Sequence, residues 1–146
     1  TMTQKKNKIT CAIIVNVKDD LLLTKRGREP FKGKWALISG IGESRKGIIP
    51  EAGIVEEVRC DIGTTSFKGK YIFSLPIQND LITDELMVFE GKINEHEIEI
   101  QQEFSQGYKW VPRKNLEEFE NLAFEHSQII KRYLRLYNRK HRQYVI

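Results

Sequence analysis

The sequence predicts an α/β (α+β) sandwich, in which a mixed β-sheet lies between helices. The 146 residues have the length of one ordinary domain, and 40% hydrophobic with 30% charged residues is typical of a globular chain. Strand-like segments precede and follow a segment with helix start and stop signals, and the chain closes on an amphipathic helix. Because no repeat or linker divides the chain, we expect a single domain over residues 1–146.

The first part of the chain alternates short strands with polar loops. Ile9 to Val17 is β-branched and mostly apolar, which predicts a buried strand, and Leu21 to Lys25 returns as the second arm of a hairpin. Arg26 to Lys34 contains two glycines and a proline and is expected to be a loop. Trp35 to Ile38 is expected to be a short strand that runs into a glycine-containing loop from Ser39 to Gly47.

A helix is expected next. Pro50 suits the first turn of a helix, where its missing N–H costs nothing, and Gly63 is a good left-handed terminator just after Asp61. The later elements are expected to be strands at Phe67 to Leu75, Glu85 to Ile93 and Gly107 to Val111, a short helix at Asn115 to Glu120, and a last helix from Phe124 to about Arg139.

The net charge of +4 is concentrated at the C-terminal end. Six cations and no acid lie between Lys131 and Arg142, and without them the remaining 18 basic and 20 acidic residues give about −2. Residues 131–146 are therefore a basic end of the last helix. Contact with nucleic acid through this end is one interpretation. The other, which we favour, is a solvated helix face that needs no partner.

Composition also excludes several classes of protein. The longest apolar runs are Ala12 to Val15 and Leu21 to Leu23, too short for a membrane helix, so no membrane partner is expected. No secretory signal is evident, and two cysteines cannot make a disulfide framework or match a zinc pattern. We expect a cytoplasmic protein; a homodimer stays open.

A cluster of acids lies on the first helix. Glu57 and Asp61 are four residues apart and share a helix face, and Glu56 lies beside them. Clustered carboxylates repel one another unless a cation neutralises them, and hard oxygen ligands suit Mg²⁺ or Mn²⁺. Such a helix suits diphosphate hydrolysis, whereas a plain solvated acidic face is the alternative.

The same stretch resembles the Nudix hydrolase family, whose box reads G-x5-E-x7-R-E-U-x-E-E-x-G-U, with U a bulky aliphatic residue. Counted from Gly42 the spacing holds throughout, and the matching residues are Gly42, Glu57, Val58 and Gly63. The box departs from the family pattern at Ile48 (for Glu), Glu56 (for Arg), Cys60 (for Glu) and Thr64 (for an aliphatic residue). The resemblance implies a Nudix-like α/β/α sandwich with one box helix and a C-terminal helix.

The resemblance also implies roles for single residues. Glu57 would be a metal ligand or base, and Asp61 a shorter metal-binding acid one turn later. The carbonyl of Gly40 would be a backbone ligand, and Glu56 would join the metal set with a charge opposite to that of the arginine it replaces. Glu43 and Glu103 are candidate bases, although solvated loop acids are at least as good an interpretation.

Four further residues are suited to ligand binding. Arg26 and Arg28 can clamp phosphate, while Phe31 and Trp35 can stack a nucleobase; loop solvation and core packing are the alternatives.

The predicted function is metal-dependent hydrolysis of a nucleoside diphosphate linked to another moiety. Lys25 to Leu37 and Ala123 to Ile130 look most like ADP-ribose pyrophosphatases, so ADP-ribose is the leading substrate. The alternative is a degenerate Nudix domain that binds or senses a nucleotide, because Ile48, Glu56 and Cys60 replace residues of the box.

Overall fold

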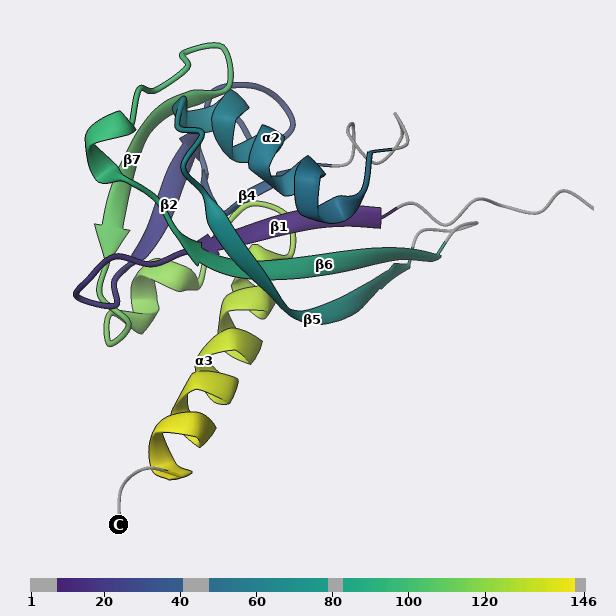
Figure 1. Cartoon of the computed structure of the whole chain (residues 1–146), viewed down its shortest axis with the longest axis vertical. Helices are drawn as coiled ribbons and strands as arrows, with labels where there is room; N and C mark the ends of the chain where they lie inside the picture. The colour runs from purple at the N-terminus through teal and green to yellow at the C-terminus, as the bar shows by residue number, and fades with distance from the viewer. Residues whose placement is uncertain (1–7, 41–47, 79–82, 144–146) are drawn as a thin grey trace, which may run out of the picture.

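The computed structural model describes residues 8–40, 48–78 and 83–143. Two β-sheets lie with two α-helices in one body (Figure 1). The elements are β1 (Lys8–Ile14), β2 (Leu21–Arg26), β3 (Trp35–Ala36), β4 (Ile38–Gly40), α2 (Pro50–Ile62), β5 (Lys68–Gln78), β6 (Thr83–Lys92), the 3-10 helix η1 (Glu95–Glu97), β7 (Ser105–Val111), the 3-10 helix η2 (Leu116–Phe119) and α3 (His126–Gln143).

The larger sheet is mixed, as predicted. Its order is β4-β1-β6-β5, in which β1 and β6 are parallel and the other neighbours are antiparallel. The smaller sheet, β3-β2-β7, is antiparallel throughout. Together with the two helices, the sheets give the α+β architecture that the sequence predicts.

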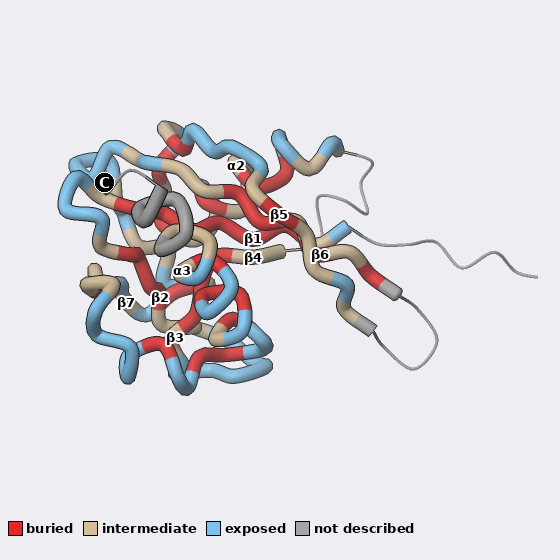
Figure 2. The backbone as a smooth tube through the Cα atoms, turned by 90° about the horizontal axis from the view of Figure 1, so that it is seen from below, coloured by how far each residue is buried: buried red, intermediate tan, exposed pale blue. Residues whose placement is uncertain are grey.

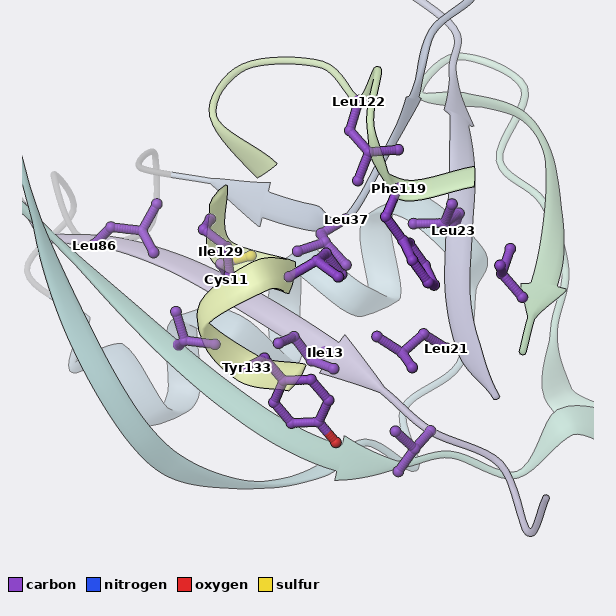
Figure 3. Packing of buried hydrophobic residues seen from close by; sticks show 14 of the residues in the cluster. Cys11, Ile13, Leu21, Leu23, Leu37, Leu86, Phe119, Leu122, Ile129 and Tyr133 are labelled. Atoms are coloured by element: carbon purple, nitrogen blue, oxygen red, sulfur yellow. The ribbon is translucent and has the colours of Figure 1, made fainter. Parts of the chain in front are cut away.

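The two helices cover opposite faces of β1. Because successive strand residues point to opposite faces, Cys11 and Ile13 pack in the core that includes Ile129 and Tyr133 of α3 (Figure 3). Ala12 and Ile14 pack in a second core, whose α2 members are Ile54, Val58 and Ile62. Both faces of β1 are therefore buried, which explains why its sequence is a continuous apolar run. Buried residues follow the strands, and exposed ones lie mostly on the connections (Figure 2).

The hairpin predicted from Ile9 to Lys25 is wrong. One bridge, Val15 with Leu21, joins the two segments, and β1 and β2 then belong to different sheets. Asn16 organises the turn between them, because its side-chain oxygen accepts hydrogen bonds from the backbone N–H groups of Lys18 and Asp20. The strand predicted at Trp35 to Ile38 likewise divides at Leu37 into β3 and β4, one in each sheet.

The box helix has the predicted ends. Pro50 is its first residue, and Gly63 follows its last with φ 76° and an N–H that donates to the Arg59 carbonyl at 2.9 Å. This positive φ suits glycine, and the helix therefore ends at Ile62, one residue after Asp61. At the other end of the chain, α3 runs past the sheets (Figure 1). Within the described residues, no helix is long and apolar enough to cross a membrane.

Candidate functional site

A cavity of about 850 Å³ lies where both sheets and both helices meet. This is within the usual size range of small-molecule sites. Its lining residues come from β1, from β2 and the following loop, from β3 and β4, from α2, from β5 and β6, from the segment before β7, and from the start of α3 with the two residues before it. They are Ile9, Thr24, Arg26, Arg28, Phe31, Ala36, Leu37, Ser39, Gly40, Glu57, Cys60, Asp61, Ile77, Leu86, Phe104, Phe124, Glu125, His126 and Ile129.

The acid pair predicted on α2 faces this cavity. Glu57 and Asp61 both line it, one helical turn apart. Burial and, next to it, the neighbouring Glu57 charge together raise the pKa of Asp61 to about 7, against the opposing effect of Arg26 and Arg28. A carboxyl group with these surroundings is held close to the point at which it gains or loses its proton at neutral pH.

Gly40 lies next to this acid pair, and we call Glu57, Asp61 and Gly40 together the acid corner of the cavity. A Cβ at position 40 would collide with the Glu57 carboxylate, so only glycine lets that carboxylate lie against the end of β4. The Gly40 carbonyl accepts a long hydrogen bond, 3.4 Å, from the Thr10 hydroxyl and keeps a second lone pair. Glu57 and Asp61 of α2 and the end of β4 at Gly40 thus line the same cavity, with Glu57 against Gly40.

Two arginines and two phenylalanines also line the cavity. The Arg26 guanidinium lies 4.8 Å from the centre of the Phe124 ring, and that of Arg28 lies 4.3 Å from the Phe104 ring. Arg26 is fixed further by its Nε, which donates to the Pro30 carbonyl at 2.7 Å. Such stacking orients the guanidinium groups while leaving N–H donors for an anion.

Phe31 and Phe124 form an exposed aromatic pair. Their rings meet edge to face at 4.9 Å, although the residues lie on loops far apart in the sequence. They are 41% and 44% exposed, and their φ angles are 63° and 54°. A left-handed backbone is rare for a bulky residue and occurs where the surrounding structure over-determines it, often at ligand sites.

His126 is the first residue of α3, and its ring connects this helix to β4. Its Nδ1 accepts a hydrogen bond from the Leu37 N–H at 3.0 Å, and its Nε2 lies 3.3 Å from the Ser39 hydroxyl. Burial and, to a smaller extent, the Arg26 charge together lower the pKa of His126 to about 4. The ring is therefore neutral at neutral pH.

Other predicted site residues lie outside the cavity lining. Glu56 pairs with Arg59 at 2.7 Å, on a more exposed side of α2. Trp35 packs against the core, with the Lys109 ammonium 4.2 Å from its ring. Glu103 is exposed, next to the lining residue Phe104. Glu43, and with it Gly42 of the box, lies outside the described residues.

The substituted box positions differ in their placement. Cys60 lines the cavity, and burial raises the pKa of its thiol. A protonated thiol is a poor ligand for a hard cation. Ile48 is only partly buried. Among the described residues, no three carboxylate, histidine or cysteine side chains converge on one point.

Sequence reasoning missed several cavity residues. Ser39 and Phe104 belong to no motif, and the folded chain alone brings them to the cavity. Phe124 and His126 belong to a segment that resembles a family motif, but periodicity assigns them only to the start of a helix. Their role depends on contacts with Phe31 and Leu37, which local sequence does not specify.

No family model and no curated protein matches the sequence, whereas solved structures do. The Nudix domain of Shewanella oneidensis NrtR, solved in complex with ADP-ribose, superposes with a TM-score of 0.73 and 17% identity over 91% of this chain and 89% of that one. The MutT protein from Methanosarcina mazei Go1 gives 0.73 and 20% over 92% and 97%. The MutT Nudix hydrolase from Burkholderia pseudomallei gives 0.67 and 16% over 87% and 96%. The chain has the Nudix fold.

The Nudix fold agrees with the resemblance that the box predicts. Gly40 and the α2 residues Glu57, Cys60 and Asp61, which belong to the stretch that resembles the box, line the cavity. At these identities the comparisons concern the fold. Function is therefore argued from the side chains in the cavity.

Proposed function

We propose that the cavity binds a nucleoside diphosphate linked to a second moiety, with ADP-ribose as the leading candidate, and that the chain hydrolyses the diphosphate. The convergence of two carboxylates, two guanidinium groups and two exposed aromatic rings on one cavity supports this most directly. Guanidinium groups bind phosphate, and aromatic rings stack on a nucleobase. A Nudix domain of the same fold has been solved with ADP-ribose, which supports the same class of ligand.

The acid corner fits Mg²⁺ or Mn²⁺. Glu57, Asp61 and the Gly40 carbonyl supply only hard oxygen donors, and the two carboxylates repel each other without a cation. Mg²⁺ is commonly held by one or two carboxylates and completes its coordination with water and substrate phosphates, so two acids suffice. When bound, the ion would neutralise charge on the diphosphate.

The chain's own residues would orient the ligand. Arg26 and Arg28 would bind phosphate oxygens, and Phe31 with Phe124 would hold the base at the mouth of the cavity. Water attacks one phosphorus atom, a new P–O bond forms, and the bond to the bridging oxygen breaks. The products are a nucleoside monophosphate and the phosphorylated second moiety; each is a monoester with a second pKa of about 6, so about two protons are released to solvent at neutral pH.

The test is release of AMP from ADP-ribose with Mg²⁺ or Mn²⁺, followed by chromatography. Removing one charge-stabilising group at such a site costs about 10²–10³ in rate, which is the loss we expect for Glu57→Gln. Glu51→Gln is the matched control, because Glu51 is an exposed acid in the first turn of the same helix and does not line the cavity. Equal background rates for the wild type and Glu57→Gln would refute hydrolysis.

A second candidate is binding without turnover. Glu56 is engaged by Arg59, Ile48 replaces a box acid, and the described residues supply no third acid to the corner. In that case ADP-ribose raises the melting temperature, metal is not required for the rise, and no AMP forms. Failure of all nucleotides to raise the melting temperature would contradict both candidates.

A further inference from the structure

Ser39 and His126 form a polar pair on the cavity wall, beside the acid corner. Ser39 is the residue before Gly40 in β4, and His126 is the first residue of α3. Both line the cavity, and His126 is only 3% exposed. Ser39 was not among the residues that the sequence or the box marks for a function. The direction of its hydrogen bond can be worked out from its neighbours.

The proton on the His126 ring must be on Nε2. A backbone N–H can only donate, so the bond of 3.0 Å from Leu37 N–H to Nδ1 requires a lone pair on Nδ1. A neutral ring with a lone pair on Nδ1 carries its proton on Nε2. Nε2 therefore donates to the Ser39 oxygen, 3.3 Å away.

The Ser39 hydroxyl is thereby fixed as a donor. With its oxygen accepting from His126, its own hydrogen must point to a different acceptor. Within the described parts of the chain, the Ser39 side chain makes no other hydrogen bond, and the residue faces the cavity. Accepting a bond also polarises the hydroxyl and strengthens its donation.

We infer that Ser39 donates its hydroxyl hydrogen to a phosphate oxygen of the bound nucleotide, and that His126 is the positioning residue that holds it in this orientation. The inference rests on the nucleotide binding proposed above. A phosphate oxygen is an acceptor only, which matches a group whose accepting position is filled. Arg26 and Arg28 on the same cavity, and the acid corner one residue away, locate the diphosphate near Ser39.

The experiment measures the Kd of ADP-ribose, AMP and adenosine by calorimetry. Loss of a hydrogen bond to a charged group weakens binding about tenfold, which we expect for ADP-ribose and AMP with Ser39→Ala and Ser39→Cys. Adenosine lacks phosphate, so its Kd stays unchanged. Ser39→Thr keeps a hydroxyl and restores binding to within about threefold of wild type. Ser74→Ala is the matched control, because the Ser74 hydroxyl pairs with Tyr71 on exposed β5, outside the cavity lining.

A second measurement needs no variant. Two-bond proton–nitrogen NMR spectra of the wild type distinguish the two neutral tautomers of His126, and we expect the Nε2-protonated form. The Nδ1-protonated form would overturn the inference. So would unchanged affinity for AMP in Ser39→Ala, an equal loss with adenosine, or failure of the wild type to bind any of the three compounds. Binding that depends on Ser39 but gives no AMP from ADP-ribose refutes hydrolysis alone.

Discussion

Gly40 has no side chain, and the Glu57 carboxylate occupies the space that a Cβ would need. Gly40→Ala therefore displaces Glu57 from the corner that it shares with Asp61. The colliding atoms are at the far end of a flexible side chain, so we expect the stability to change by less than about 1 kcal/mol. The rate of ADP-ribose hydrolysis, by contrast, falls about 10²-fold.

Denaturation and the hydrolysis assay, on the same preparation, check this prediction. Gly107→Ala is the control, because a Cβ at position 107 meets no atom within 4 Å. An active Gly40→Ala protein would show that the position of Glu57 is unimportant.

The raised pKa of Asp61 means that its charged form lowers the free energy of unfolding of the chain without bound metal. Its pKa is about 7 in the folded chain against an ordinary value of 3.8. Between these values the folded chain keeps a proton that the unfolded chain has lost, so the contribution of this group to stability falls as pH rises and reaches its minimum above pH 7. We expect Asp61→Asn to be more stable than wild type by about 1–2 kcal/mol at pH 8, with no gain near pH 4.

Urea denaturation across this pH range measures the difference between the two proteins. A variant that is less stable than wild type at pH 8 would contradict the prediction.

At the scale of elements, His126 gives the contact between α3 and β4 a dependence on pH. Its pKa is lowered from 6.5 to about 4 because burial disfavours the charged ring and the Arg26 charge repels it. As pH falls below 6.5 the unfolded chain gains a proton that the folded chain excludes, so stability is lost as pH falls from 6.5 towards 4. At 1.36 kcal/mol per pKa unit, the loss reaches about 3 kcal/mol.

His126→Gln has no titrating ring at this position. The difference by which its free energy of unfolding lies below that of the wild type should therefore become smaller as pH falls through this range. Comparing the two proteins by denaturation cancels the opposite pH dependence of Asp61, which both contain. If the difference in free energy of unfolding stays constant from pH 7 to 4.5, the lowered pKa of His126 is refuted.

Further along α3, a polar network holds the helix against β6 and the segment that follows β7. The Tyr133 hydroxyl donates to the Glu90 carboxylate and accepts from Arg113 Nη2 at 2.8 Å. Arg113 Nε in turn donates to the Asp19 carbonyl at 2.7 Å. We expect Tyr133→Phe to lower the free energy of unfolding by about 1–3 kcal/mol, because two partners lose a buried hydrogen bond.

ADP-ribose binding should be unchanged in this variant, because Tyr133 does not line the cavity. Tyr71→Phe is the control; the hydroxyl of Tyr71 bonds to Ser74 at the exposed surface, where its removal costs about 0.5 kcal/mol or less. Stability equal to wild type in Tyr133→Phe would mean that the network contributes nothing to the docking of α3.

The sequence predicts elements whose signals are local. Pro50 and Gly63 mark the ends of α2 to within one residue, since a missing N–H and a left-handed φ are properties of those residues alone. Pairing between strands depends instead on which faces are covered. The run Ala12 to Ile14 does not reveal that one helix covers each of its faces, and so the hairpin with Leu21 was wrongly expected.

The cavity residues also divide into those that a local sequence signal predicts and those that only long-range contacts bring together. Glu57, Asp61 and Gly40 are predictable because helical spacing and a box motif bring them together, and the structure places all three at one corner. The contact between Phe31 and Phe124 joins two loops more than 90 positions apart, and the bond between His126 and Leu37 spans 89. Such pairs leave no periodic signal in a single sequence.

At the scale of the whole molecule, the cavity and the basic end of α3 are separate. Among the described residues, those that line the cavity all lie at or before Ile129, whereas the six cations begin at Lys131. Figure 1 shows α3 leaving the sheets toward its C-terminal end. Truncation after Tyr137 removes Arg139, Lys140 and Arg142 with no acid, so the net charge falls from +4 to +1.

We expect this truncation to leave ligand binding intact. A ligand at about 100 times its Kd stabilises the folded state by about 2.7 kcal/mol, and the resulting rise in melting temperature with ADP-ribose should be equal in both proteins. Binding to RNA or DNA oligomers at about 150 mM salt should also be equally weak in both, because a solvated helix face needs no partner. Fluorescence anisotropy of labelled RNA and DNA oligomers across a salt series measures this binding. Steeply salt-dependent binding that the truncation removes would make this end of the helix a nucleic-acid contact, independent of the cavity.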